Sequence, residues 1–307
     1  NLRSHAEELA RTLDDYLTER ERDVTLMARH PLIRSFSTAP PQERSALRAQ
    51  VLTDLANFLE INSYYQCAFL LDSSGQLLLS TAEDADPQAA SRPYFLRALA
   101  GETTISEPSL PGSESGTGLS DPAGAVIYFS APVPHPEGKG IETSPSATGV
   151  LNGSVKIVGV AVLRVRAGEL WERVERQADH AGKGSLAILF DEYGIRLAHS
   201  QSRELVFRAV APLSQEVERR LLAEGRFGDL DRIEVLPFPD LARGLREAAG
   251  RPYFTHHLAV SSDLYHAVAV PLRTRRWTVV ESVPEPAFLA SVSTFSRVLE
   301  PRSATFN

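Results

Sequence analysis

The pattern of apolar and charged positions is most regular over residues 1–30, where it predicts one long amphipathic helix. Apolar side chains recur there at three- and four-residue steps, at Leu2, Ala6, Leu9, Leu13, Tyr16 or Leu17, Val24 and Met27. Pro31 predicts that the helix ends at or before His30, because the residue before a proline is disfavoured in the helical region. A helix of this length measures about 45 Å. We expect it to follow two modules or to pair with a second copy, and an ordinary surface helix is the alternative.

The pattern after this helix changes from helical to strand-like. A second helix is expected after Pro40 and Pro41, with Leu47, Val51 and Leu55 on one face. Segments 64–71 and 76–80 then alternate as a hairpin around Gly75, which supplies the positive φ of a tight turn. Further strands are expected at 103–108, 126–132 and 157–165, with a helix at 167–180. Segments 109–124 and 134–154 are rich in Gly, Ser and Pro, which predicts loops.

The same order of elements starts again in the second half of the chain. Three pairs of segments match, namely 68–78 with 187–197, 127–133 with 266–272, and 158–165 with 277–283. In the first pair, Asp72 and Gly75 coincide with Asp191 and Gly194. The fold class that follows is α+β, with two tandem modules that each consist of an antiparallel sheet flanked by helices. No strand–helix–strand alternation of the parallel kind is visible.

Composition limits the class of protein further. The 307 residues are 43% hydrophobic and 23% charged, which is enough for two domains with their own cores. A formal charge of -7 argues against a nucleic-acid binder. The single cysteine, Cys67, allows no internal disulfide, and its apolar neighbours favour a buried, unreactive thiol. No apolar run is long enough to span a bilayer, but both ends show the helical pattern expected next to membrane anchors.

A candidate binding site begins at Arg92, which is followed by Pro93, Tyr94 and Phe95. A forked cation beside two aromatic rings, ahead of rigid strands, is suited to a small carboxylate. The strands at 103–108 and 126–132 add three candidate lining residues, Ser106, Tyr128 and Ser130. In the alternative interpretation, the arginine lies on the surface and the aromatic rings belong to the core. The related run 251–254 enters a predicted strand before a turn at 261–263, and we interpret it as structural.

Enzyme motifs are absent from the sequence. Nucleophile-elbow, zinc-protease and phosphate-loop patterns do not occur, and Gly116 and Gly118 lie in a Ser/Gly-rich loop. The adjacent His256 and His257 are expected on opposite faces of a strand, so they do not suit one metal. Asp72 and Asp191 are expected to cap their own turns. We therefore predict no catalytic residue, no metal site and no cofactor.

The order and spacing of these elements, from the long helix to the run 276–284, resemble a double Cache domain, the extracytoplasmic sensor of bacterial transmembrane receptors. Each module of that family is PAS-like. The resemblance covers nearly the whole chain and implies four parts: a signalling helix at 1–36, a membrane-distal module at 37–166, a membrane-proximal module at 167–284, and a helix leading to the membrane at 285–307. The exit helix itself is expected at 286–299.

The resemblance also places the ligand around Arg92, Tyr94 and Phe95, which match the family's Arg-x-Trp/Tyr-Tyr/Phe motif. Arg92 is expected to hold a carboxylate through two parallel hydrogen bonds. Where the amino-acid-binding branch has an aspartate and a tyrosine, this chain has Arg164 and Pro87. A second arginine predicts a ligand with two anionic ends, such as a dicarboxylate or other organic acid. The alternatives are a strand register shifted by one residue or an Arg164 that points to solvent.

Two classes of function stay open at this point. The first is a periplasmic ligand-sensing domain of an inner-membrane receptor, such as a sensor histidine kinase or chemoreceptor, that is a homodimer when intact and binds an organic acid or other carboxylate. The alternative is a free-standing periplasmic binding or scaffold protein without an output domain. Flanking sequence discriminates between them, because only the first requires an apolar span on both sides.

Overall fold

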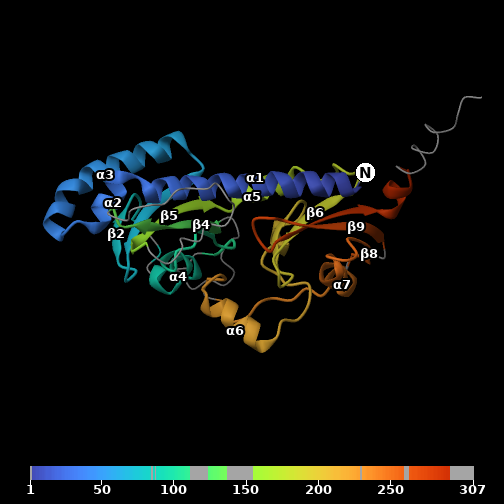
Figure 1. Ribbon diagram of the computed structural model, residues 1–307. Coiled ribbons are helices and arrows are strands. Elements are labelled where there is room, and N and C mark those ends of the chain that lie inside the picture. The colour runs from blue at the N-terminus through green and yellow to red at the C-terminus, as the bar shows by residue number, and fades with distance from the viewer. Residues whose placement is uncertain are drawn as a thin grey trace, which may run out of the picture. The chain divides into compact units, whose positions relative to one another are not determined.

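The computed structural model describes residues 2–83, 86, 88–110, 124–136, 155–228, 230–258 and 263–290. The chain forms two compact units (Figure 1). The first-sheet unit comprises Asp15–Leu170 and Ser214–Arg232, and the second-sheet unit comprises Asn1–Asp14, Trp171–Leu213 and Ile233–Asn307. Segment Ser214–Arg232 thus groups with the first sheet, although it lies within the range predicted for the second module.

The long N-terminal helix is confirmed as α1 (Leu2–Arg29), which ends just before Pro31. Its buried residues follow the predicted stripe, and Ala6, Leu13 and Leu17 have no exposed surface. A short helix that the sequence analysis missed, α2 (Pro31–Thr38), begins at the proline, because proline fits the first turn of a helix. Helix α3 (Pro41–Ile61) follows as predicted and buries Val51 and Leu55.

The first sheet is antiparallel throughout and has the order β2-β1-β5-β4-β3. Its strands are β1 (Tyr65–Asp72), β2 (Leu77–Ser80), β3 (Thr104–Ile105), β4 (Val126–Pro134) and β5 (Ile157–Arg166). The 3-10 turn η1 (Ala89–Ser91) and helix α4 (Pro93–Leu99) lie on one face, while α2 and α3 lie on the other side (Figure 1). The site described below lies on the α4 face.

The second sheet repeats this arrangement as β7-β6-β10-β9-β8, again with antiparallel neighbours. Its strands are β6 (Leu186–Phe190), β7 (Arg196–His199), β8 (Tyr253–His257), β9 (Leu264–Pro271) and β10 (Thr278–Pro284). The remaining helical elements are α5 (Gly168–Glu175), η3 (Arg203–Leu205), α6 (Gln215–Ala223) and α7 (Pro239–Glu247). Both sheets place the strands of a repeat in the order second, first, fifth, fourth, third, which confirms two tandem modules of one fold.

The hairpin turns of the two modules have the same hydrogen bonds. In each turn, the Oδ1 atom of Asp72 or Asp191 accepts the backbone N–H groups two and four residues later, at 2.8–2.9 Å. Gly75 and Gly194 have φ of 85° and 75°, a region that favours glycine. The predicted capping roles of the two aspartates are confirmed.

Other predictions have mixed outcomes. Cys67 is fully buried, as expected. The helix predicted at 167–180 is shorter, because α5 ends at Glu175. The predicted exit helix begins at Glu285 and is described to Ala290, and its remainder lies outside the described residues, as do Pro87 and most of the two predicted loops. Among the described helices, none combines the length and hydrophobicity needed to cross a bilayer.

Candidate functional site

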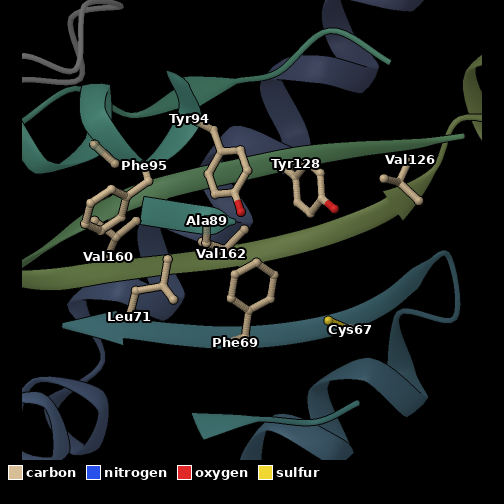
Figure 2. Close-up of a cluster of buried hydrophobic side chains, with 11 residues drawn as sticks. Cys67, Phe69, Leu71, Ala89, Tyr94, Phe95, Val126, Tyr128, Val160 and Val162 are labelled. Atoms are coloured by element: carbon tan, nitrogen blue, oxygen red, sulfur yellow. The ribbon is translucent and has the colours of Figure 1, made fainter. Parts of the chain in front are cut away.

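The aromatic part of the site comes from α4 and the central strands. Tyr94 and Phe95 are buried in the first turn of α4, directly behind Pro93. The Tyr94 ring stacks on Tyr128 of β4 at 4.6 Å between centroids and 22° between planes. Tyr128 meets Phe69 of β1 edge to face at 6.3 Å (Figure 2). The three rings form one aromatic wall, an arrangement favoured by their electrostatics.

Arg92, the residue before α4, forms an ion pair with Asp86. Its Nε donates to Oδ2 at 2.9 Å, and the two side chains are only 16% and 5% exposed. The Tyr94 hydroxyl donates to the same oxygen at 3.2 Å, and the Gln88 N–H donates to Oδ1 at 3.0 Å. Asp86 was missed in the sequence analysis, although an acid six residues before the candidate arginine was a usable signal.

Arg92 also holds a segment from the second half of the sequence. Its Nη1 donates to the backbone carbonyl of Glu224 at 2.8 Å. Gly225 follows with φ +67°, and a Cβ there would lie 1.4 Å from Nη1 of Arg92. The Leu110 N–H donates to the Arg226 carbonyl at 2.9 Å beside this contact. Two of the five N–H donors of Arg92 therefore have protein acceptors, one on Nε and one on Nη1.

Arg164 of β5 lies on the same face of the sheet as the aromatic wall. It is the register partner of Tyr128 on β4 and of Cys67 on β1, and register partners point to one side of a sheet. Tyr128 and Cys67 both belong to the core under α4, and Arg164 is 8% exposed. The two alternatives, a shifted register and an arginine in solvent, are therefore wrong.

Ser106 and Ser130 hold the backbone around the rings. The fully buried Ser130 hydroxyl donates to the Tyr94 carbonyl at 2.8 Å. The Ser106 hydroxyl donates to the Glu107 carbonyl at 2.8 Å and accepts the Tyr128 N–H at 2.9 Å. Both serines therefore position the two tyrosines.

Phe95 lies deeper, beside Leu71 and Val160 in the hydrophobic core (Figure 2). Of the seven predicted site residues, four come together with the newly found acid. We call this set the arginine–tyrosine cluster: Asp86, Arg92, Tyr94, Tyr128 and Arg164.

Electrostatics keep the two phenols protonated. Burial raises the pKa of Tyr128 to about 12, an effect to which Asp86 adds and which Arg164 and Arg92 oppose. Burial and the Asp86 charge likewise raise the pKa of Tyr94. Both phenols are therefore neutral at pH 7, and the Tyr94 hydroxyl donates its hydrogen bond to Asp86. The Tyr128 hydroxyl and the two neighbouring guanidinium groups are suited to binding an anion.

The histidines of the described residues do not form a metal site. In the described parts of the chain, no three His, Cys, Asp or Glu residues are placed so that they could hold a metal ion. His256 is buried and lies 3.0 Å from the Ser282 hydroxyl, whereas the His257 side chain is 56% exposed. The two imidazoles face opposite ways, as predicted.

The fold agrees with the one that the resemblance to a double Cache domain implies, a long N-terminal helix followed by two tandem PAS-like modules. Three solved structures resemble it over nearly their whole length. The sensor domain of the V. cholerae histidine kinase DctB is 18% identical, with 92% of this chain and 97% of that chain covered and a TM-score of 0.62. The ligand-binding domain of the Pseudomonas fluorescens chemoreceptor CtaA, in complex with L-serine, is 15% identical and has a TM-score of 0.54. The match covers 93% of this chain and 96% of that chain.

The third structure is the ligand-binding domain of the Pseudomonas aeruginosa amino-acid chemoreceptor PctC, in complex with GABA. It is 17% identical, with 92% of this chain and 98% of that chain covered and a TM-score of 0.53. No family model matches the sequence, and no curated protein matches it. These neighbours are sensor and ligand-binding domains, and at such identities their likeness defines the fold.

Proposed function

We propose that this chain is the extracytoplasmic ligand-sensing domain of a bacterial transmembrane receptor, such as a sensor histidine kinase, and that it binds a small carboxylate at the arginine–tyrosine cluster. The observation that carries the proposal is the pair of arginines, Arg92 and Arg164, gathered with two protonated tyrosines on one face of the first sheet. Its fold neighbours are sensor domains of kinases and chemoreceptors, and the serine and GABA bound in two of them are carboxylates.

Arg164 is a candidate for the ligand's anchor, because it lies beside Tyr128 in the middle of the sheet and on the face that carries the aromatic wall. Arg92 is held by Asp86 and by the Glu224 carbonyl at the edge of the same cluster. In this setting a ligand carboxylate receives charge-assisted hydrogen bonds away from bulk water, which are stronger than neutral ones. Arg92 supplies a second positive charge, and its Nη2 group is a further hydrogen-bond donor for the ligand.

Signal transmission in this proposal passes through α1 in a homodimeric, membrane-attached receptor of the periplasm. Residues 2–14 of the helix belong to the second-sheet unit, and residues 15–29 belong to the first-sheet unit that carries the cluster. Shifts of about 1–2 Å along a packed helix are an established switching scale. The alternative, a free-standing periplasmic protein, lacks apolar spans on both sides of this chain, so the flanking sequence decides between them.

A thermal-shift screen tests ligand binding across a panel of small molecules. Organic acids, amino acids and their uncharged amides are added to the purified chain, and the melting temperature is recorded. A ligand at about a hundred times its Kd stabilises the folded state by about 2.7 kcal/mol, which is a shift of several degrees. We expect stabilisation by a small carboxylate and none by its amide. Equal shifts with an acid and its amide, or no shift with any acid, contradict the proposal.

A further inference from the structure

Glu281 lies on β10, the central strand of the second sheet, and points away from α7. The preceding residue, Val280, belongs to the core cluster that includes Leu241 and Ala242 of α7. Because successive side chains of a strand point to opposite faces, the Glu281 carboxyl group lies on the other face of the sheet. The N-terminal part of α1 and α7 lie on opposite sides of this sheet (Figure 1).

Two contacts fix the N-terminal part of α1 along β10. In the turn that leads into the strand, two backbone N–H groups donate to the Asp14 carboxylate at 3.0 Å. Near the other end of the strand, the turn after α5 brings His180 against His5 of α1, with 5.0 Å between the ring centroids. The same turn lies beside Val283, since a Cβ on Gly182 would be 3.7 Å from the Cγ2 atom of that valine. The helix therefore runs over the face of β10 to which the odd-numbered residues of the strand point.

The carboxyl group of Glu281 is enclosed in this layer. Between its two fixed points, α1 buries Ala6, Leu9 and Leu13, and Glu281 has no exposed surface. Among the described residues, neither carboxylate oxygen has a hydrogen-bond partner. Burial alone raises the pKa of Glu281 to about 8. The group is therefore protonated at neutral pH, and its ionised form needs contact with water.

Other titratable groups lie on this side of the second-sheet unit, and each has a contact of its own. They are His5 and Asp14 of α1, His180 of the turn after α5, Tyr253 of β8, His266 of β9 and Glu285 after β10. Strand β6 places the apolar residues Ala187 and Leu189 on this face. The pKa of Glu281 responds to burial and not to these groups, so the glutamate titrates on its own.

We propose that Glu281 is a proton-binding site through which the second module senses pH. With the proton in place, α1 stays packed on β10, and loss of the proton favours a conformation in which α1 has moved and the carboxylate reaches water. The group binds its proton more tightly when α1 is packed, so a rise from about pH 5 to 8 favours the displaced form by up to about tenfold per pH unit. Because α1 is also the transmitter proposed for the carboxylate site, the proton is a second input to the same helix. The inference holds whether or not the first module binds a carboxylate.

Hydrogen exchange measured by mass spectrometry at pH 6 and pH 8 tests this inference on the purified chain. The unmutated chain and Glu281→Gln are compared at each pH, which cancels the chemical exchange rate and the titration of the histidines. We expect the exchange rate of residues 2–14, divided by the rate in the variant, to rise by about 50-fold between pH 6 and pH 8. The same ratio for α7, on the opposite face of the sheet, should change by less than about threefold, because separate elements open independently.

Two further variants serve as controls. Glu172→Gln changes an exposed glutamate of the same unit and should keep the pH response of the unmutated chain. Glu281→Met removes the titrating group and keeps an apolar side chain, so it should behave like Glu281→Gln and replaces that variant if glutamine prevents folding. An equal pH response in α1 and α7 would show that Glu281 affects global stability only, and would overturn the inference. An unchanged ratio for residues 2–14 would overturn it as well.

Discussion

Glu281 shows what burial does to a single charged residue in this fold. It lies on β10 with no exposed surface, and within the described part of the chain neither carboxylate oxygen has a hydrogen-bond partner. Its register partners are Ala187 and Val268, both of them apolar. Burial raises the pKa of Glu281 to about 8 from 4.5. The folded protein therefore keeps a proton that the unfolded chain releases above about pH 4.5.

Glu281→Gln should remove a pH-dependent loss of stability. Because the folded-state pKa is raised, the free energy of unfolding falls as pH increases from about 5 to 8, by up to about 1.4 kcal/mol per pH unit. We expect the unmutated chain to lose about 2–3 kcal/mol relative to Glu281→Gln between pH 5 and pH 7.5. Urea unfolding at both pH values measures this difference.

The matched control for this experiment is Glu172→Gln, which changes an exposed glutamate of the same unit. His199 works in the opposite direction, because burial lowers its pKa to about 4 and makes stability rise from about pH 4 to 6.5. The contribution of His199 is the same in the unmutated chain and in Glu281→Gln. The difference between their free energies of unfolding therefore reports on Glu281 alone. A difference that is the same at pH 5 and pH 7.5 would show that Glu281 is not protonated in the folded state.

Segment Ser214–Arg232 belongs to a different compact unit from the residues before and after it in the sequence. It includes α6, which buries only Leu221, and it groups with the first sheet although both of its neighbours along the chain belong to the second-sheet unit. The contacts of Arg92 with Glu224 and of Leu110 with Arg226 attach it there. The segment thus links the site to the chain of the other module through its own backbone.

Gly225→Ala should loosen this attachment. The added Cβ would meet Nη1 of Arg92, and its φ of +67° is unfavourable for alanine. We expect a loss of about 1–2 kcal/mol in the free energy of unfolding, partly relieved in the double variant with Arg92→Ala. Gly168→Ala is the control, because a Cβ there meets nothing within 4 Å. Equal stabilities of the two single variants would contradict the observed contact.

Periodicity in the sequence identified the elements whose apolar positions recur regularly. It predicted α1, α3 and the two hairpins, whose turns are further marked by Asp72 and Asp191. It missed α2 because Pro31 looked like a stop, and it missed α6 and α7 because they are short and bury few residues. The contact between Arg92 and Glu224 joins residues 132 positions apart, which no local pattern reveals.

The site itself was predictable in part. The aromatic pair after Arg92 and the strand position of Arg164 were local signals, and the structure brings those residues together. What the sequence could not reveal is the contact of Arg92 with the Glu224 carbonyl, because a backbone acceptor far along the chain leaves no local signal. The consequence is that two of the Arg92 N–H donors already have protein acceptors.

At the scale of the whole molecule, two sheets of the same order carry different side chains at equivalent positions. Cys67 of β1 corresponds to Leu186 of β6 in the repeat. Their register partners on the central strands are Arg164 in the first sheet and Ser282 in the second. On the next strand, Tyr128 corresponds to Ala267. The second module thus lacks the equivalents of Arg164 and Tyr128, and we expect one carboxylate site per chain.

The measurement that tests this account most directly is isothermal titration calorimetry of the purified chain with the best carboxylate from the thermal-shift screen, in parallel with two variants. We predict one ligand per chain for the unmutated protein and for Arg48→Ala, which changes an exposed arginine of α3. Arg164→Ala should weaken binding by about a hundredfold, since a charge-assisted contact of this kind contributes about 1.5–3 kcal/mol. Two ligands per chain, or unchanged affinity in Arg164→Ala, would contradict the placement of the site.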